Sequence, residues 1–335
     1  MPEDAKIALI TGIAGQDGSY LTELLLEKGY IIHGVVRPTA DLSASAIAHW
    51  PGDGKTGHDC LFLHRADLSD AAVWRELLHD VRPAELYHLA GPSRVGSSFG
   101  LPESTFEQIA SLTAQLLDIV LAERPSVRVF HASTAEIFGD TPEVPQTEET
   151  PLRPLSPYGR AKAVATETAR TYRERGLFIC NGILYNHESP RRGEYFVTRK
   201  IARAVARIAK GLDRELVLGN LDSRRDWGHA QDYVRAMWLM LQHRLADDYI
   251  LATGETHSVR EFVEAAFAVV ALPWQKFVRQ DASLNRPADP QLVGNPRKIR
   301  EALGWQPTRS FQELVREMVE AELEMLKENV EELRG

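Results

Sequence analysis

The chain has few cysteines, no excess of positive charge and no long apolar run. Cys60 and Cys180 are its only cysteines in 335 residues, too few for a disulfide framework or for a zinc site built from several cysteines. The formal net charge of -8 argues against general affinity for nucleic acid, although local Arg and Lys side chains can still gather around one phosphorylated ligand. The longest apolar runs, such as 236–241, are far shorter than the ~20 residues of a membrane-spanning helix. We therefore expect no nucleic-acid partner, no membrane partner and no metal site.

The first residues also lack the pattern of a secretion signal. MPEDAK is acidic and leads directly into IALIT, with no basic region followed by an apolar stretch and a small-residue cleavage site. Together with the scarcity of cysteine, this predicts a protein of the reducing cytoplasm.

Short β-branched runs alternate with longer stretches of helical period through the first half of the chain. Strands are expected at 6–11, 30–36, 61–64, 85–90 and 127–133, with helices at 19–28, 70–81 and 105–123 between them. Strands separated by helices cannot pair as hairpins, so they form a parallel sheet with helices on both faces. The predicted fold class is therefore α/β, a doubly wound sheet of the Rossmann type.

After Tyr185 the rhythm becomes irregular, which indicates a second, smaller and mostly helical domain. A helix is expected from about Val197, a helix and a strand return at 232–242 and 248–253, and a packed terminal helix covers 311–333. We therefore expect two interleaved domains, a dinucleotide-binding domain of 1–185 and 226–256 and a substrate domain of 186–225 and 257–335.

The segment 11–18, TGIAGQDG, follows the first expected strand and opens the first expected helix. Gly12, Gly15 and Gly18 lie where the backbone must approach a pyrophosphate, with Gln16 and Asp17 between them. Backbone N–H groups and the positive end of the helix can hold the phosphates there, whereas the alternative is an ordinary glycine-rich turn. The position between strand and helix favours dinucleotide binding.

Residues after the next strands are further candidates for cofactor contacts. Arg37 follows the second strand, where a carboxylate would favour NAD; an arginine can pair with a 2′-phosphate, so NADP is favoured over NAD. Contacts to adenine and ribose are expected after the third and fourth strands, at Asp67, Leu68, Leu89 and Ser93.

Four residues form a candidate catalytic group. Tyr158 and Lys162 are four apart in SPYGRAK, so they share one helix face, and the ammonium can favour the tyrosinate that removes a hydroxyl proton. Thr134 and Glu136 follow the strand at 127–133. A carboxylate there suits removal of a proton from the carbon next to a keto group, which water elimination requires and simple reduction or epimerisation does not. The alternative interpretations are a surface Tyr–Lys pair and an exposed acid at a strand end.

Over essentially its whole length, the chain resembles the GDP-mannose 4,6-dehydratases. The resemblance is carried by TGIAGQDGSYLTELLLEKGY, STAEIFG, SPYGRAK, NGILYNHESPRRGEYFVTRKIARAVA, LGNLDSRRDWGHAQDYVRAMWLMLQ and ATGETHSVREFVE. It implies tightly held NADP and a cycle that oxidises C4, loses water across C5 and C6, and returns hydride to C6. It assigns deprotonation of the C4 hydroxyl to Tyr158, its tuning to Lys162, hydrogen bonding to Thr134 and elimination to Glu136.

The resemblance also implies further contacts and partners. His187 and Arg192 match cofactor-contacting positions, and the nucleotide-sugar substrate, GDP-mannose or a close relative, would be held by Asn186, Val197, Lys200, Arg225, Arg286 and Asp289. A homodimer or homotetramer is expected. The chain departs from the family at Pro38, Arg94 and Ser104, which keeps open a dehydratase or epimerase for a related nucleotide sugar such as a GDP-heptose, and more remotely a non-catalytic cofactor-binding protein.

Overall fold

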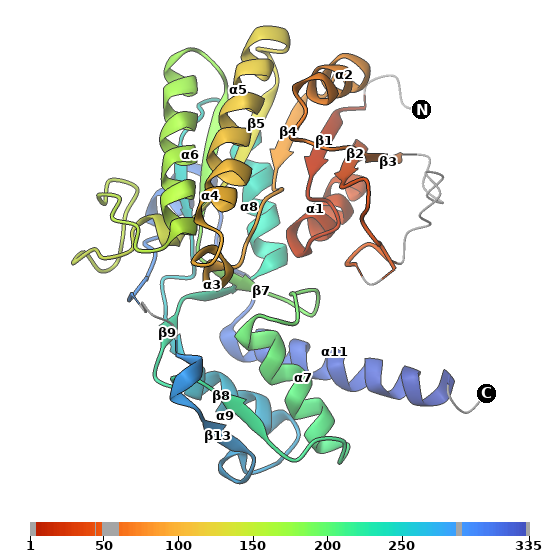
Figure 1. The fold of residues 1–335 in the computed structure, drawn as a ribbon, viewed down its shortest axis with the longest axis vertical. Helices are drawn as coiled ribbons and strands as arrows, with labels where there is room; N and C mark the ends of the chain where they lie inside the picture. The colour runs from red at the N-terminus through yellow and green to blue at the C-terminus, as the bar shows by residue number, and fades with distance from the viewer. Residues whose placement is uncertain (1–4, 44, 49–59, 286–289, 333–335) are drawn as a thin grey trace.

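A computed structural model describes residues 5–43, 45–48, 60–285 and 290–332, with side chains described up to 327. Its centre is a sheet of seven parallel strands in the order β11-β6-β5-β4-β1-β2-β3 (Figure 1). The strands are β1 (Ile7–Thr11), β2 (Ile31–Val36), β3 (Leu61–Arg65), β4 (Glu85–His88), β5 (Arg128–Thr134), β6 (Ile179–Leu184) and β11 (Asp248–Leu251). The order turns back at β1, beside β4, so the predicted doubly wound sheet is confirmed.

The strand sequences explain why the sheet is buried on both faces. Every residue of β4 (ELYH), β6 (ICNGIL) and β11 (DYIL) is buried, as is usual for parallel strands covered on both faces. Their few polar residues must therefore find partners inside the protein.

Helices cover both faces of the sheet, as expected. One apolar cluster packs α1 (Gln16–Glu27), α8 (Ala230–Gln242) and α10 (Arg297–Leu303) on one face, and another packs α2 (Ala71–Val81), α5 (Leu112–Glu123) and α6 (Pro157–Glu174) on the other (Figure 1). Trp305, just after α10, is fully buried and donates from Nε1 to the Asp232 carbonyl oxygen at 2.8 Å. The segment around α10 thus packs against the main sheet.

The helix expected at 105–123 begins earlier and is not regular throughout. It consists of α4 (Pro102–Phe106), one π-helical turn (Glu107–Ser111) and α5, and is preceded by the short α3 (Val95–Ser98). Single π-helical turns are frequent at functional sites. Here the turn brings Ile109 against Tyr158 in one small apolar cluster.

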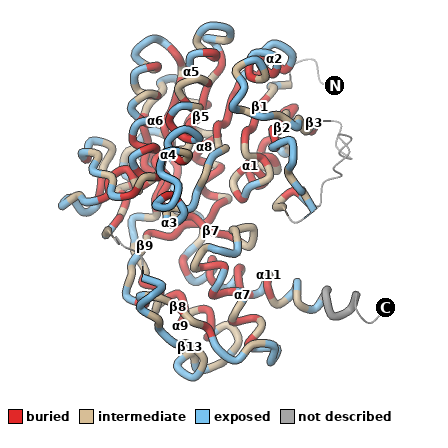
Figure 2. Tube along the Cα trace, in the orientation of Figure 1, coloured by how far each residue is buried: buried red, intermediate tan, exposed pale blue. Residues whose placement is uncertain are grey.

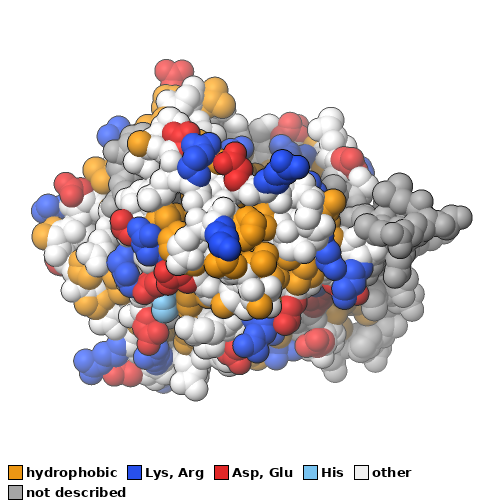
Figure 3. Space-filling view, turned by 90° about the horizontal axis from the view of Figure 1, so that it is seen from below, with side chains coloured by type: hydrophobic (Ala, Val, Ile, Leu, Met, Phe, Trp, Pro, Cys, Tyr) orange, Lys and Arg blue, Asp and Glu red, His pale blue; other side chains and the backbone are white. Residues whose placement is uncertain are grey.

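A second core lies below the sheet in Figure 1, built by α7 (Val197–Ala209), α9 (Val259–Val269) and α11 (Phe311–Glu332). The rings of Trp227, Phe262 and Phe311 contact one another in this core. Figure 2 shows buried residues running through both cores. The division into the two predicted domains stays a prediction. Seen from below in Figure 3, this end carries apolar side chains with basic ones among them.

In the part of the chain that the structure describes, three short strand pairs and three 3-10 turns complete the fold. The pairs are β7 (Asn186–Glu188) with β10 (Trp227–His229), β8 (Leu216–Leu218) with β13 (Val278–Gln280), and β9 (Arg224–Arg225) with β12 (His257–Ser258). The turns span 135–137, 274–276 and 282–284. Among the described helices, none is long and apolar enough to cross a membrane.

Candidate active site

The predicted site residues gather where the parallel strands end. Gly12 follows β1, Arg37 follows β2, Leu89 follows β4 and Glu136 follows β5, while Asp67 and Leu68 come just after β3. In open parallel sheets, ligands bind at this edge, beside the strands where the order reverses. Here those strands are β1 and β4.

Two glycines of the first turn are required by its geometry. Gly12 has a φ of +73°, and a Cβ there would lie 3.0 Å from the Ala90 nitrogen. A Cβ on Gly18 would lie 2.5 Å from both the Gly12 oxygen and the Ile13 Cα. Gly15 precedes α1 and has no side chain that could cap the helix, so the first N–H groups of α1 are available to an anion.

Thr11 joins this turn to the loop after β4. Its Oγ1 accepts from the Leu89 and Ala90 nitrogens at 3.2 and 3.1 Å and lies 3.0 Å from His88 Nδ1. We infer that the Thr11 proton goes to His88, because burial lowers the pKa of His88 to about 3 and leaves its ring neutral. Sequence reasoning had not singled out Thr11, although it stands directly before the glycines. Ser93, farther along this loop, is exposed.

Asp17 and His187, both predicted to contact the cofactor, form a buried ion pair. Asp17 Oδ2 lies 2.8 Å from His187 Nε2, and His187 Nδ1 lies 2.8 Å from the Tyr185 carbonyl oxygen. Burial opposes both charges, but their mutual attraction outweighs it, so the pKa of His187 is raised and the pKa of Asp17 is lowered. Acceptors at both nitrogens favour the imidazolium form of His187, and its ring stacks on Tyr233 with 4.6 Å between centroids.

Gln16 strengthens this connection. Its Nε2 donates to the His187 carbonyl oxygen at 3.1 Å, and its Oε1 accepts from Ser189 Oγ at 2.8 Å. Arg191 donates to Ser19 Oγ at 3.1 Å. The start of α1 is thereby fastened to the segment after β6. Ser189 was not predicted, because only the tertiary fold reveals a partner so distant in sequence.

Tyr158 lies in the first turn of α6, with its backbone N–H donating to Ser98 Oγ at 3.2 Å. Burial raises the pKa of Tyr158 to about 12, a hydrogen bond from Thr134 and the charge of Arg192 lower it, and the charge of Glu136 raises it. Thr134 Oγ1 also accepts from the Glu136 nitrogen at 3.3 Å. The structure therefore brings together Thr134, Glu136, Tyr158 and Arg192.

Lys162 follows Tyr158 by one turn of α6, and its effect on that phenol stays a prediction. Its Nζ donates to the Ala132 carbonyl oxygen at 2.7 Å, and burial lowers the pKa of Lys162 to about 8. Burial dominates the pKa of Tyr158, and one cation that lowers this pKa is Arg192. Arg192 is itself held 3.1 Å from Glu188, with its guanidinium over the Phe196 ring.

The residues predicted to hold the substrate lie on elements of the second core or beside it. Asn186 is in β7, Val197 begins α7, Lys200 donates from Nζ to the Val217 carbonyl oxygen at 2.7 Å, and Arg225 is half-buried in β9. Arg286 and Asp289 lie outside the described residues. Two residues predicted to contact the cofactor, Arg37 and Asp67, are exposed, and they follow β2 and β3 at the end of the strand order opposite β11.

Asp226, which was not predicted, anchors the strand that carries Arg225. Its carboxylate accepts from the Thr253 nitrogen and hydroxyl at 2.8 and 2.7 Å and from the Gly254 nitrogen at 3.0 Å. Burial raises the pKa of Asp226 to about 6. Its sequence neighbours Arg224 and Arg225 suggest a surface charge cluster, so burial could not be foreseen.

The sequence is similar to that of known proteins over most of its length. The family model described as GDP-mannose 4,6 dehydratase matches residues 9–318. GDP-mannose 4,6 dehydratase 2 of Arabidopsis thaliana is 47% identical over 97% of this chain and 89% of its own length. The GDP-mannose 4,6 dehydratase of Homo sapiens is 44% identical over 98% of this chain and 94% of its own.

Solved structures share the fold. The dTDP-glucose 4,6-dehydratase of Streptomyces venezuelae, determined with NAD bound, is 26% identical with a TM-score of 0.82 over 95% of this chain and 97% of its own. The UDP-glucose 4-epimerase of Thermus thermophilus, in complex with NAD, is also 26% identical, with a TM-score of 0.80 over 94% and 98%. With a family model covering most of its length and relatives of this identity, the chain belongs to the GDP-mannose 4,6-dehydratase family.

Proposed function

We propose that the protein is a GDP-mannose 4,6-dehydratase, a lyase that converts GDP-mannose to GDP-4-keto-6-deoxymannose. The observation that carries this proposal is that half-buried Glu136 donates from its backbone nitrogen to Thr134 Oγ1 at 3.3 Å and lies near enough to Tyr158 for its charge to raise the pKa of that phenol. A reductase or epimerase needs the tyrosine and the hydroxyl, whereas removal of water from a keto sugar also needs a base for the carbon next to the carbonyl.

The turn at 12–18 fits the pyrophosphate of a nicotinamide dinucleotide. The close approach of Gly18 to Gly12 and the uncapped start of α1 provide backbone N–H groups without obstruction by side chains. Exposed Arg37, directly after β2, favours NADP over NAD because it can pair with a 2′-phosphate. When bound, the cofactor supplies the hydride acceptor for C4 and the hydride donor for C6.

The chain's own residues would move the protons. Tyr158 takes the proton of the C4 hydroxyl as that carbon is oxidised, and Thr134 hydrogen-bonds the same oxygen. The resulting C4 ketone acidifies C5, from which Glu136 removes the proton. Glu136 then returns this proton to the departing C6 hydroxyl, which leaves as water. As hydride returns to C6, C5 takes up the proton held by Tyr158, which restores the starting state of the side chains. Arg192 supports the first step, since its charge favours the tyrosinate.

Binding of the nucleotide sugar is proposed to occur between the two cores. The elements carrying Lys200 and Arg225 can direct cations at a diphosphate, with Asn186 and Val197 beside them. In this proposal 1–185 and 226–256 bind the cofactor, and 186–225 and 257–335 bind the substrate, where Arg286 and Asp289 are further candidates.

We also propose a homodimer or homotetramer in the cytoplasm. Exposed apolar side chains lie on and around α3, α4 and α6, which pack together: Phe99, Leu101, Phe106 and Val164, 43–63% exposed. Apolar groups exposed this close together favour contact with another subunit. Cys60 and Cys180 are both free thiols, which suits a reducing compartment.

The test is mass spectrometry of GDP-mannose incubated with the purified protein and no added cofactor. We expect a product lighter by one water, with rate loss of roughly 10²–10⁴-fold in Glu136→Gln and unchanged cofactor content. Unchanged water loss in Glu136→Gln would overturn the assigned base. No product from GDP-mannose even with NADP or NAD, but water loss from a GDP-heptose, would move the assignment to that relative.

A further inference from the structure

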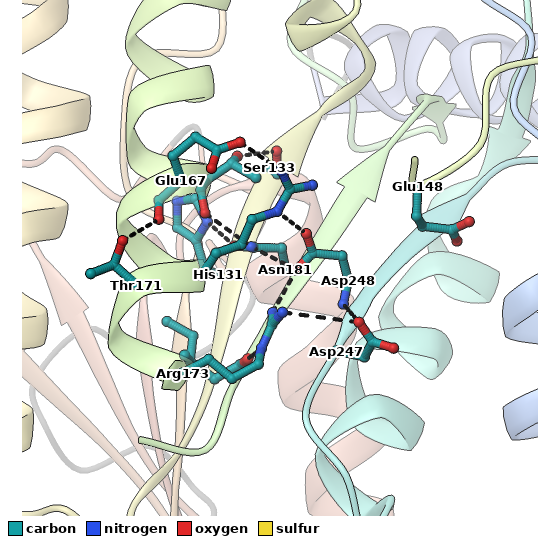
Figure 4. A network of polar contacts seen from close by, with 12 residues as sticks. His131, Ser133, Glu148, Glu167, Thr171, Arg173, Asn181, Asp247 and Asp248 are labelled. Atoms are coloured by element: carbon teal, nitrogen blue, oxygen red, sulfur yellow. Dashed lines mark hydrogen bonds and ion pairs between the residues drawn. The ribbon is translucent and has the colours of Figure 1, made fainter. Parts of the chain in front are cut away.

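A chain of hydrogen bonds crosses the sheet beside Lys162. His131, Asn181 and Asp248 are direct neighbours on β5, β6 and β11, and Figure 4 shows them in line. His131 Nδ1 lies 2.9 Å from Asn181 Oδ1, and Asn181 Nδ2 donates to Asp248 Oδ1 at 2.8 Å. Asp248 accepts in turn from Arg170 and Arg173. All three sheet residues are buried.

The chain determines which nitrogen of His131 carries the proton. Asn181 Nδ2 donates both to Asp248 and to the Thr166 carbonyl oxygen at 3.2 Å, so its amide oxygen is the atom that faces His131. Because an amide oxygen only accepts, His131 Nδ1 must donate. Burial also lowers the pKa of His131 to about 3, so the ring is neutral and Nε2 carries a lone pair.

This lone pair has no partner. His131 is 2% exposed, and its Nε2 is a buried atom without a hydrogen bond to any described residue. Buried polar atoms in native proteins nearly always have a hydrogen-bond partner. An unpaired acceptor whose tautomer is set by Asn181 and Asp248 therefore requires an explanation. The ring does stack near His88 on β4, at 6.3 Å between centroids, but stacking leaves the lone pair free.

Lys162 lies on the same side of the sheet as this lone pair. Ser133, two residues after His131 on β5, is bonded to Thr166 at 2.6 Å, and Thr166 follows Lys162 by one helical turn. The Lys162 charge also acts on both His131 and His88. An ammonium has three protons, and one of them goes to the Ala132 carbonyl oxygen.

We propose that His131 is a positioning residue for Lys162, and that its Nε2 accepts a hydrogen bond from the Lys162 ammonium group, with at most one water between them. The Asp248–Asn181 chain keeps the acceptor in the required tautomer. The titratable and charged groups around His131 are His88 on β4, Lys162 on α6 and Asp248 on β11, with Arg170 and Arg173 beyond Asp248. The inference rests on the proposed function, in which the base is Tyr158, one helical turn before Lys162 on α6.

A matched pair of variants separates this role from packing. His131→Asn keeps a donor near the Nδ1 position and removes Nε2, whereas His131→Gln places an amide near the Nε2 position. Without this acceptor the Lys162 ammonium is easier to deprotonate. The alkaline limb of the pH profile of kcat/KM should therefore move down by about one pH unit in His131→Asn, which is a tenfold change in the acid dissociation constant of Lys162. His131→Gln should keep the limb within about 0.3 unit of wild type. An unmoved limb in His131→Asn, or equal shifts in both variants, would refute the proposal.

A second measurement needs neither turnover nor a His131 variant. In protein labelled with ¹⁵N-histidine, we expect His131 to show a protonated Nδ1 and an unprotonated Nε2 between pH 6 and 8. The Nε2 signal should change in Lys162→Met and stay unchanged in Tyr158→Phe. A protonated Nε2, or no response to Lys162→Met, overturns the inference whether or not GDP-mannose is the substrate. A correct nitrogen pattern without water loss by the wild type would instead reject the proposed function alone.

Discussion

Replacing Asp17 by asparagine tests the buried ion pair that fastens the start of α1 to β7. The change keeps shape and removes the charge that makes His187 an imidazolium. Breaking a buried pair typically costs ~3–5 kcal/mol, but His187 can lose its proton, and the Asp17 side chain is 20% exposed. We therefore expect a loss of about 2 kcal/mol in the free energy of unfolding at pH 5.5, near the value of one hydrogen bond to a charged group.

The pH dependence gives this prediction its sign. The pKa of His187 is raised above its ordinary 6.5, so its contribution is complete below that pH and is lost as pH rises through the raised value. The pKa of Asp17 is lowered below 3.8, so its contribution is complete above 3.8 and is lost as pH falls. The difference between wild type and Asp17→Asn should thus be largest between about pH 4 and 6.5 and should shrink by pH 9.

Urea unfolding at pH 5.5 and pH 9 measures the loss of unfolding free energy and its pH dependence. A double-mutant cycle with His187→Gln isolates the interaction between Asp17 and His187. Glu301→Gln is the control, since it breaks the pair with Arg297 at 2.7 Å, in which both side chains are largely exposed. That control should change stability little at either pH. Equal stability of Asp17→Asn and wild type at pH 5.5, or a difference as large at pH 9, would refute the reasoning.

Three further predictions concern the cofactor turn, cofactor choice and assembly. Gly18→Ala should lower the free energy of unfolding by ~1–3 kcal/mol and release the cofactor, because the new Cβ would lie 2.5 Å from the Gly12 oxygen. Gly96→Ala, where the new Cβ meets open space, should change neither the urea unfolding curve nor the cofactor content. Equal results for the two variants would contradict this geometry. Arg37→Asp should reduce the NADP to NAD preference at least about tenfold in measured Kd values, through loss of a charge-assisted contact; an unchanged ratio would remove Arg37 from the site. Phe106→Glu should reduce the molecular mass in light scattering, whereas Leu245→Glu should not, since Leu245 is exposed in the loop between α8 and β11. An unchanged oligomer in Phe106→Glu would place the subunit contact elsewhere.

Local sequence patterns correctly predicted features that depend on a single strand, helix or turn. The short strand-like runs predict every strand of the first half, Pro157 begins α6, and the glycine turn lies between β1 and α1 as expected. The helix at 105–123 was expected to be regular, and its π-helical turn was missed because no residue type marks such a turn. The short pairs formed by β7, β8 and β9 were also missed, since strands of two or three residues carry no detectable periodicity.

The sequence by itself determined the doubly wound fold, the glycine turn and the candidate group of Thr134, Glu136, Tyr158 and Lys162, because turn chemistry and helical spacing act over a few residues. Only the tertiary structure decided the charge states and partners of these groups. Asp17 meets His187 across 170 positions of sequence, Tyr158 is buried enough to raise its pKa to about 12, and Lys162 donates to the Ala132 carbonyl oxygen. Burial and long-range pairing set these properties, and neither leaves a local pattern in the chain.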